Sequence, residues 1–124
     1  MVKYVKLHHA SHLVDDIETA VAFYRDVLGM EISHERPDLG FPGAWLSVGD
    51  QQIHLLELPD PDGNSVRPEH AGRDRHTALQ VRGLDDIVTA LNSAGIPFTR
   101  SRSGRQAVFV RDPDGNGIEL IEMV

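Results

Sequence analysis

Four side chains able to bind a divalent metal occupy matching positions in two halves of the chain. His9 and His76 each open a short stretch that ends in valine, and His54 and Glu119 lie in the similar segments Ile-His-Leu-Leu-Glu and Ile-Glu-Leu-Ile-Glu. Nearly equal lengths of chain separate His9 from His54 and His76 from Glu119. Three imidazoles and one carboxylate suit a first-row divalent cation such as Mn, Fe, Co, Ni, Cu or Zn better than Ca or Mg. We therefore predict one metal site built from these four residues.

A smaller set of the same residues would also bind a metal. His9, His76 and Glu119 alone would form the two-histidine, one-carboxylate triad that leaves positions open for substrate or oxygen. His54 is then either a fourth ligand or a nearby polar group. The alternative is that all four are unrelated polar residues on strands, but their repeat-equivalent positions favour the metal site.

Other polar residues near these positions are expected to point away from the metal. His8 and His12 lie one and three positions from His9, so strand alternation places them on the opposite face. Glu57 and Glu122 each follow a predicted ligand by three residues and fall on the reverse face for the same reason.

The elements that must position the four residues repeat as strand–helix–strand–strand–strand. Asp15 is expected to cap the first helix together with Glu18, and Gly29 and Gly95 are placed to end the two helices. The apolar stripe of the second helix starts at Leu84. The expected strands are 6–14, 30–34, 44–48 and 51–58 in the first half, and 76–81, 96–100, 107–111 and 117–123 in the second.

The repeat predicts an α+β fold. Neither half is large enough to bury the face of its own sheet, so the two sheets must share an interior. We predict a single domain over 1–124, with βαβββ modules at 1–58 and 76–124 and a linker at 59–75. The two modules should form a curled, half-barrel sheet around the metal cavity, with the helices outside.

Composition excludes several classes of function. The 124 residues carry a net charge of −7, which argues against nucleic acid as a partner, and no cysteine is available for a disulfide, a thiolate site or a nucleophile. No apolar run is long enough to cross a membrane, and no signal peptide is evident, so we expect a cytoplasmic location. Four arginines cluster late in the chain and form either a solvated surface or an anion-binding loop: Arg100, Arg102, Arg105 and Arg111.

Two sequence motifs carry a family resemblance that spans nearly the whole chain. Leu-His-His at 7–9, Asp-Asp-Ile-Glu at 15–18 and Ala-Phe-Tyr-Arg-Asp-Val-Leu-Gly-Met at 22–30 closely resemble the opening of vicinal oxygen chelate proteins. Phe-Val-Arg-Asp-Pro-Asp-Gly-Asn-Gly-Ile-Glu-Leu at 109–120 resembles their closing hairpin. This superfamily includes glyoxalases, bleomycin resistance proteins and extradiol dioxygenases.

The resemblance implies a metal-dependent active site. In glyoxalase I the four matching positions bind a divalent metal, and carboxylate ligands take part in proton transfer. His9, His76 and Glu119 match the bacterial pattern, which makes Glu119 the candidate catalytic residue. His54 departs from that pattern, because those enzymes have a glutamate there. Extradiol dioxygenases and fosfomycin-resistance transferases use two histidines and one glutamate, which the same three residues would supply.

The expected function is that of an enzyme that chelates two neighbouring oxygens of a small substrate and performs glyoxalase-like lyase or isomerase chemistry. Arg102 and Arg105 are the candidate contacts to an anionic group of the substrate. The alternatives are an extradiol-type dioxygenase, a fosfomycin-type transferase, or a metal-free binding protein of the bleomycin-sequestering kind. A homodimer is expected, with the metal site either inside one chain or shared between two.

Overall fold

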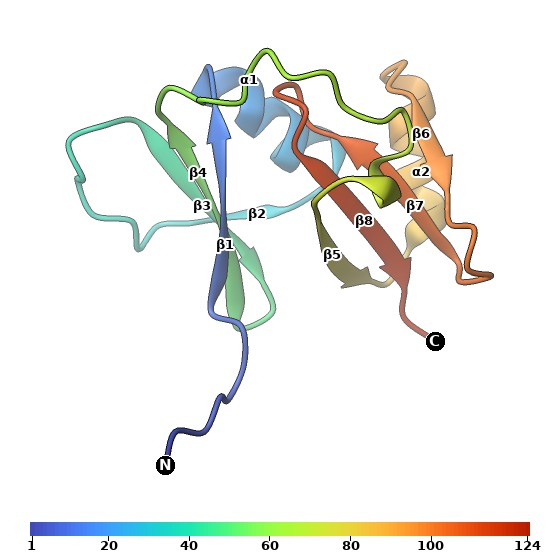
Figure 1. Ribbon diagram of the computed structural model, residues 1–124, viewed down its shortest axis with the longest axis horizontal. Helices are drawn as coiled ribbons and strands as arrows, with labels where there is room; N and C mark the ends of the chain where they lie inside the picture. Colours follow the sequence, from blue (N-terminus) through green and yellow to red (C-terminus); the bar gives the residue numbers. More distant parts are fainter.

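The chain folds as two four-stranded sheets joined by a long connection, and the computed structural model describes all residues from 1 to 124 (Figure 1). The first module contains β1 (His9–Val14), α1 (Ile17–Val21) running into the π-helix η1 (Ala22–Val27), β2 (Glu31–Ser33), β3 (Gly43–Val48) and β4 (Gln51–Glu57). The second contains the 3-10 turn η2 (Ala71–Arg73), β5 (His76–Val81), α2 (Leu84–Ser93), β6 (Phe98–Arg100), β7 (Ala107–Arg111) and β8 (Gly117–Glu122).

The two sheets have the same topology, which confirms the tandem repeat. Their strand orders are β1-β4-β3-β2 and β5-β8-β7-β6, and in each the first strand runs parallel to the last. The pairing register is equivalent as well. Ser11 lies opposite His54 just as Ala78 lies opposite Glu119, so the predicted ligands occupy matching places in the two sheets.

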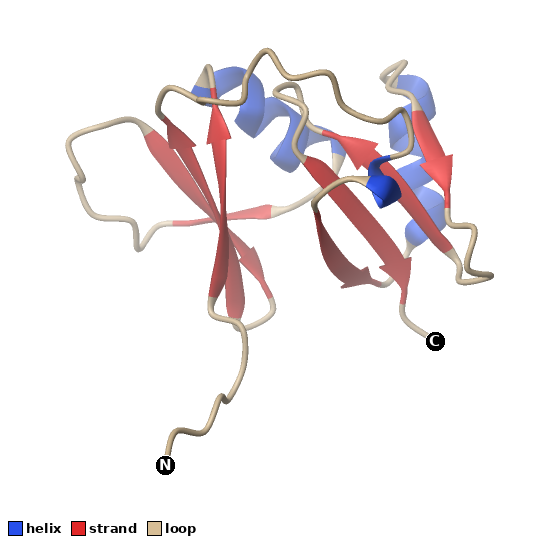
Figure 2. Ribbon diagram, in the orientation of Figure 1, coloured by secondary structure: helices blue, strands red, loops and turns tan.

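One apolar core holds both modules together. The helices lie behind the two sheets in Figure 2, and alternate strand residues face them. A single cluster of 15 buried residues draws on both sheets and both helical segments, with Leu46, Ile53, Leu91 and Ile118 at most 1% exposed. Each such side chain stabilises the fold by roughly 1.5–3 kcal/mol. Because this face of each sheet is apolar, the opposite face is left for polar residues.

The helix caps differ in part from the sequence prediction. Asp16, not Asp15, caps α1, because its carboxylate accepts a hydrogen bond from the backbone N–H of Thr19 at 3.0 Å. The capping box from Asp15 to Glu18 is therefore wrong. Asp15 is held elsewhere, since its backbone N–H donates to the carboxylate of Asp114 in the second module.

Glu57 and Glu122, which were predicted to point away from the metal, have equivalent structural roles. Glu57 accepts a hydrogen bond from the backbone N–H of Ile17 at 3.0 Å, at the start of α1. Glu122 accepts from the backbone N–H groups of Gly83 and Leu84, at the start of α2. A carboxylate at a helix N-terminus satisfies otherwise unpaired N–H groups and offsets the helix dipole. Both modules thus place a glutamate that binds a helix N-terminus three residues after a predicted ligand, His54 in the first module and Glu119 in the second.

The two sheets stand side by side without closing into a barrel (Figure 1). The linker arches over one end of both modules, and the guanidinium group of Arg111 fixes it by donating to the carbonyl of Pro68 at 2.6 Å. The side chain of Asn116 ties the modules together directly, by donating to the carbonyl of Leu13 at 3.0 Å.

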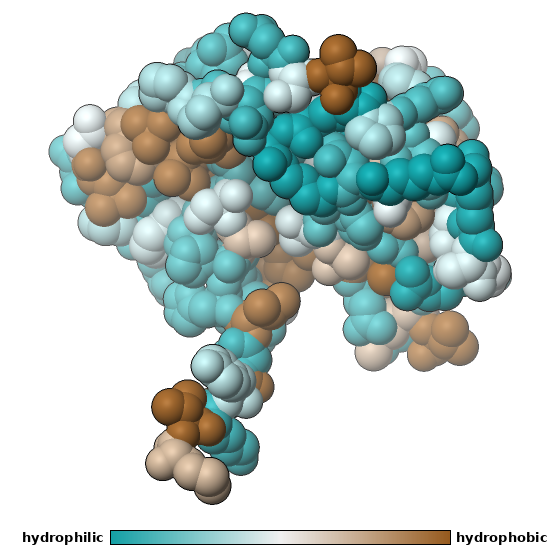
Figure 3. Space-filling model, in the orientation of Figure 1, coloured by the Kyte–Doolittle hydropathy of each residue, from teal (hydrophilic) through white to brown (hydrophobic).

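The N-terminal arm projects from this body. Residues 1–8 precede β1, and the chain start lies away from both sheets, with apolar atoms visible on the arm in Figure 3. Met1, Val2, Tyr4, Val5 and Leu7 are all exposed. None of the helices combines the length and the apolar character needed to span a bilayer.

Candidate functional site

The predicted ligands lie together in two pairs on the face of each sheet that points away from the helices. His9 and His54 stack in the first sheet, with ring centroids 4.0 Å apart. His76 and Glu119 form the second pair, with His76 Nε2 3.3 Å from Glu119 Oε1. Each pair bridges two parallel neighbouring strands, β1 with β4 and β5 with β8.

The second pair has the geometry of two ligands of one cation. His76 Nδ1 lies 2.8 Å from the carbonyl oxygen of Asp74, which can only accept, so Nδ1 carries the proton. The other ring nitrogen, Nε2, is therefore the one available to a cation, and it lies on the side of Glu119. Metal–ligand bonds of roughly 2.1 Å at tetrahedral or right angles place neighbouring ligand atoms roughly 3.0–3.4 Å apart, which matches the observed separation. A carbonyl behind a histidine in this way is the usual support of a metal ligand.

Asp74 was not predicted from the sequence to belong to the site. Its side chain holds the carbonyl that supports His76 in place. Its carboxylate pairs with Arg111 Nη1 at 3.0 Å and with Arg67 Nη1 at 3.2 Å. Burial by itself would raise the pKa of Asp74, but the backbone N–H of Arg75 and the two guanidinium groups outweigh it and lower the pKa. Asp74 is thus held as an anion, and the chain before His76 is fixed in place.

The first pair belongs to a stack of aromatic rings. Trp45 lies under His54 with an interplanar angle of 7°, and His54 lies under His9 with an angle of 16°. His54 Nε2 donates to the side-chain oxygen of Gln52 at 2.8 Å. Burial lowers the pKa of His54, and the neighbouring His9, His8 and Arg36 lower it further.

His8 and His12 differ in position, although the sequence placed both on the opposite face. His12 is buried on the helix side, as expected, and contacts Tyr24. His8 instead contacts His9, with 2.9 Å between their Nδ1 atoms. The expectation for His8 was wrong because β1 begins at His9, and strand alternation does not extend to the residue before it.

Only part of the donor set has the geometry that a divalent cation requires. Glu119 Oε2 is buried without a hydrogen-bond partner, which fits a carboxylate placed to meet a cation. The orientation of the first pair fits less directly. An imidazole nitrogen coordinates a cation in the plane of its ring, so the nearly parallel rings of His9 and His54 would share one ion only after one ring turns.

The two pairs do not meet within one chain. No cluster of three or more histidine, cysteine, aspartate or glutamate side chains is close enough to hold a metal ion. The structure therefore brings His9 to His54 and His76 to Glu119, and leaves the two half-sites separate.

The two predicted substrate arginines differ in their surroundings. Arg105 Nη2 lies 3.4 Å from Glu119 Oε2, and its Nε donates to the Ser103 hydroxyl at 3.1 Å. Arg102 is exposed and makes no ion pair. The loop before β7 thus directs one arginine, not two, at the site.

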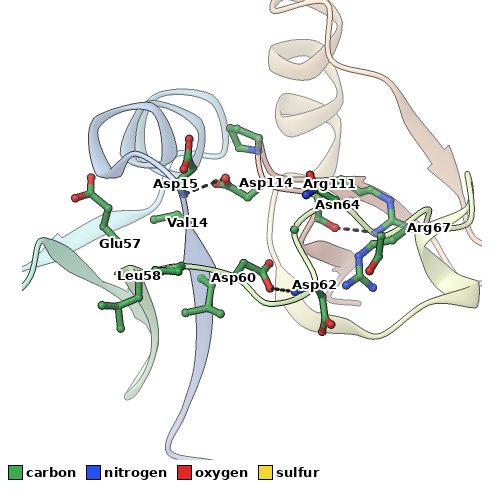
Figure 4. A pocket seen from close by; sticks show the side chains of 16 residues that line it. Val14, Asp15, Glu57, Leu58, Asp60, Asp62, Asn64, Arg67, Arg111 and Asp114 are labelled. Carbon is green, nitrogen blue, oxygen red and sulfur yellow. Dashed lines mark hydrogen bonds between the residues drawn. The ribbon is translucent and has the colours of Figure 1, made fainter.

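Two of the hollows between the modules differ in charge. A groove of about 930 Å³ under the linker contains none of the four predicted ligands (Figure 4). Its walls carry five carboxylates, from Asp15, Glu57, Asp60, Asp62 and Asp114, against the two guanidinium groups of Arg67 and Arg111. Burial raises the pKa of Asp114, and the carboxylates of Asp112, Asp15 and Asp60 raise it further. Such a groove disfavours an anion. A smaller hollow of about 200 Å³ is lined by His76 and lies at the seam between β1 and β5.

Comparison with known proteins identifies the family. The model of the Glyoxalase/Bleomycin resistance protein/Dioxygenase superfamily matches residues 6–120. The chain therefore belongs to this superfamily, and the resemblance seen in the sequence is confirmed. The paired βαβββ modules agree with the fold of its members.

Individual relatives support the same assignment. A protein named Glyoxylase I 4 from Arabidopsis thaliana is 33% identical over 120 residues, which cover 92% of this chain and 68% of the relative. A lactoylglutathione lyase from Haemophilus influenzae is 32% identical and is covered to 93%, against 95% of this chain. Among solved structures, a glyoxalase family protein from Bacillus anthracis superposes with a TM-score of 0.77 at 27% identity, over 100% of both chains. The superfamily thus includes lyases of similar length to this chain.

Proposed function

We propose that the protein is a metal-dependent lyase or isomerase that binds two neighbouring oxygens of a small substrate. His9, His54, His76 and Glu119 would hold the cation. The observation that carries the proposal is the arrangement of His76, whose protonated Nδ1 faces the Asp74 carbonyl and whose Nε2 lies 3.3 Å from Glu119 Oε1. The similarity to a lactoylglutathione lyase supports the class of reaction.

The separation of the two pairs favours a site shared by two chains. In a two-fold dimer, each surface patch meets its counterpart on the other subunit, and two identical sites result. We propose that His9 and His54 of one subunit meet His76 and Glu119 of the other. Both pairs lie on sheet faces that the helices leave uncovered, and His9 and His76 are exposed there, whereas Glu119 is buried behind His76 and Arg105.

The residues of the site would have distinct roles in the reaction. A divalent cation bound there would supply Lewis-acid stabilisation for negative charge that develops on the substrate oxygens. Glu119 would move the proton: Oε1 faces His76, while Oε2 accepts no hydrogen bond and would take a proton from the substrate and return it. Phe109 lies opposite Glu119 on the neighbouring strand and contacts His76, so it limits the access of water to the carboxylate.

Metal content tests the proposal. Protein purified without chelators should contain up to one equivalent of a first-row divalent metal per chain, measured by elemental analysis. His76→Ala and Glu119→Ala should lose the metal and keep the fold, as judged by circular dichroism. His34→Ala and Glu35→Ala are matched controls, because both side chains are exposed and contact none of the ligands. These controls should retain the metal.

The opposite result would favour a different member of the superfamily. Wild-type protein with less than about a tenth of an equivalent, and no gain on reconstitution, would indicate a metal-free binding protein. Equal metal affinity in wild type and Glu119→Ala would exclude the proposed ligand set. Consumption of oxygen with a catechol-type substrate would indicate a dioxygenase in place of a lyase.

A further inference from the structure

We propose that Arg105 alternates between two partners, Glu119 and an anionic group of the substrate, and that metal binding drives the exchange. The inference rests on the proposed function, and it adds an anion subsite that opens only when the cation is bound. The contact that carries it is the 3.4 Å approach of Arg105 Nη2 to Glu119 Oε2.

Glu119 is an unusual partner for a surface arginine. The residue is 3% exposed, and Oε2 has no hydrogen-bond donor of its own. An ionised carboxylate in such surroundings needs a compensating positive charge. Two basic side chains lie within 4 Å of its oxygens: His76 at Oε1 and Arg105 at Oε2. Of the two, Arg105 is the group that always carries a positive charge, so it supplies the compensating charge.

The position of Arg105 allows its guanidinium group to move away from Glu119. Its side chain is 56% exposed, and it belongs to a loop of small polar residues that includes Ser101, Ser103 and Gly104. The Ser103 hydroxyl accepts from Arg105 Nε and holds the base of the guanidinium group near the site. The guanidinium group can therefore turn without movement of β7, whose first four residues are buried.

A divalent cation and Arg105 oppose each other at this carboxylate. A cation on Oε1 withdraws negative charge from Oε2 and repels the guanidinium group across a distance of a few ångströms, in surroundings with little water. Once released, the guanidinium presents its paired donors beside the site, where they match the geometry of a carboxylate, sulfate or phosphate. Metal and anion then bind cooperatively, because each weakens the same internal ion pair.

The proposal predicts that removal of a positive charge tightens metal binding. In Arg105→Gln, a zinc ion no longer displaces an ion pair, so zinc affinity should rise by about threefold to tenfold. The measurement is competition with a chromophoric zinc chelator at fixed pH. Arg102→Gln is the matched control. It removes the same charge from an exposed side chain that lies three residues earlier in the chain and makes no ion pair. Its zinc affinity should equal that of wild type.

Sulfate provides the second measurement. Millimolar sulfate should raise the melting temperature of zinc-loaded wild type more than that of zinc-free protein, relative to sodium chloride at the same ionic strength. This difference should vanish in Arg105→Gln and persist in Arg102→Gln. Because coupling is reciprocal, sulfate should also raise zinc affinity by the factor by which zinc raises sulfate affinity.

The possible outcomes separate failure of the proposed function from failure of the inference about Arg105. Wild type that takes up no zinc would overturn the proposed function and this inference with it. Zinc uptake with equal or weaker affinity in Arg105→Gln would overturn the inference alone, because Arg105 would then support the carboxylate instead of competing for it. Equal sulfate responses in wild type and Arg105→Gln would exclude the anion subsite.

Discussion

The ring of His12 lies 3.1 Å from the hydroxyl of Thr77, and this contact joins the edge of the first sheet to the edge of the second. The direction of each hydrogen bond is fixed by its neighbour. Tyr24 donates its hydroxyl proton to Asp112 at 2.7 Å, so the Tyr24 oxygen accepts from His12 Nδ1. His12 Nε2 is then the acceptor of the Thr77 hydroxyl. A neutral His12 thus completes a buried polar chain between the modules.

This arrangement predicts loss of stability at mildly acidic pH. Burial lowers the pKa of His12 below its ordinary value of 6.5, although Asp112 partly opposes the shift. The unfolded chain therefore binds a proton more readily than the folded protein, and stability falls as pH drops below 6.5 until the folded-state pKa is passed. One such proton contributes a slope of at most about 1.4 kcal/mol per pH unit. Urea unfolding at several pH values between 8 and 5 measures the slope.

Replacement of His12 measures how much of the pH dependence of stability comes from this residue. His12→Leu should be less stable than wild type at pH 8, because Tyr24 and Thr77 lose their partner, but its stability should depend less steeply on pH. The pKa of His54 is also lowered, but His54 is present in both proteins, so it does not affect the comparison. His34→Ala, at an exposed position, should keep the wild-type slope. A His12→Leu slope equal to that of wild type would contradict the assignment.

Much of the fold follows from the repeat and from strand alternation. The expected strands 76–81 and 107–111 coincide with β5 and β7, and the matched positions of His54 and Glu119 appear in equivalent registers. The first cap could not be predicted, because Asp15 and Asp16 are identical in type. The choice between them depends on Asp114, which is distant in sequence.

The parts of the site that escaped prediction involve backbone atoms or tertiary contacts. Asp74 supports His76 through its carbonyl oxygen, which every residue type possesses, so its identity gave no signal. Arg105 and Arg102 occupy similar loop positions, and only the three-dimensional path of the loop directs Arg105 at Glu119. The stacking of His54 on Trp45 likewise depends on the pairing of β3 with β4.

Asp74→Asn is predicted to weaken the support of His76. The substitution leaves the carbonyl in place but removes the charge that pairs with Arg67 and Arg111, so the linker before β5 should loosen. We expect a lower melting temperature and weaker zinc binding, the latter measured by chelator competition. Asp62→Asn is the matched control, because Asp62 forms an exposed ion pair with Arg75. Exposed pairs contribute little, so this variant should resemble wild type. Identical zinc affinity in both variants would show that the carboxylate of Asp74 has no role in the site.

The first pair of ligands should be less sensitive to substitution than the second. His54 lies between two rings, and its Nε2 already donates to Gln52, so it must turn before it can coordinate a cation. His54→Ala should therefore reduce zinc affinity less than His76→Ala does, by the same chelator competition. A greater loss in His54→Ala would indicate that the essential ligand set differs from the triad of His9, His76 and Glu119.

Mixed dimers test whether the site is shared between two subunits. His9→Ala and His76→Ala each damage every site in their own homodimers. In a mixed dimer, one shared site carries both substitutions, and the other combines the intact His9 of one subunit with the intact His76 of the other. Random exchange of equal amounts makes about half of the dimers mixed, so about a quarter of all sites should regain zinc affinity. The measurement is zinc bound after joint refolding, with separately refolded and then pooled proteins as the control. A site contained within one chain would regain nothing, since every chain still carries a substitution. A monomer by sedimentation at micromolar concentration would exclude the shared site on independent grounds, because neither half-site could then meet its complement.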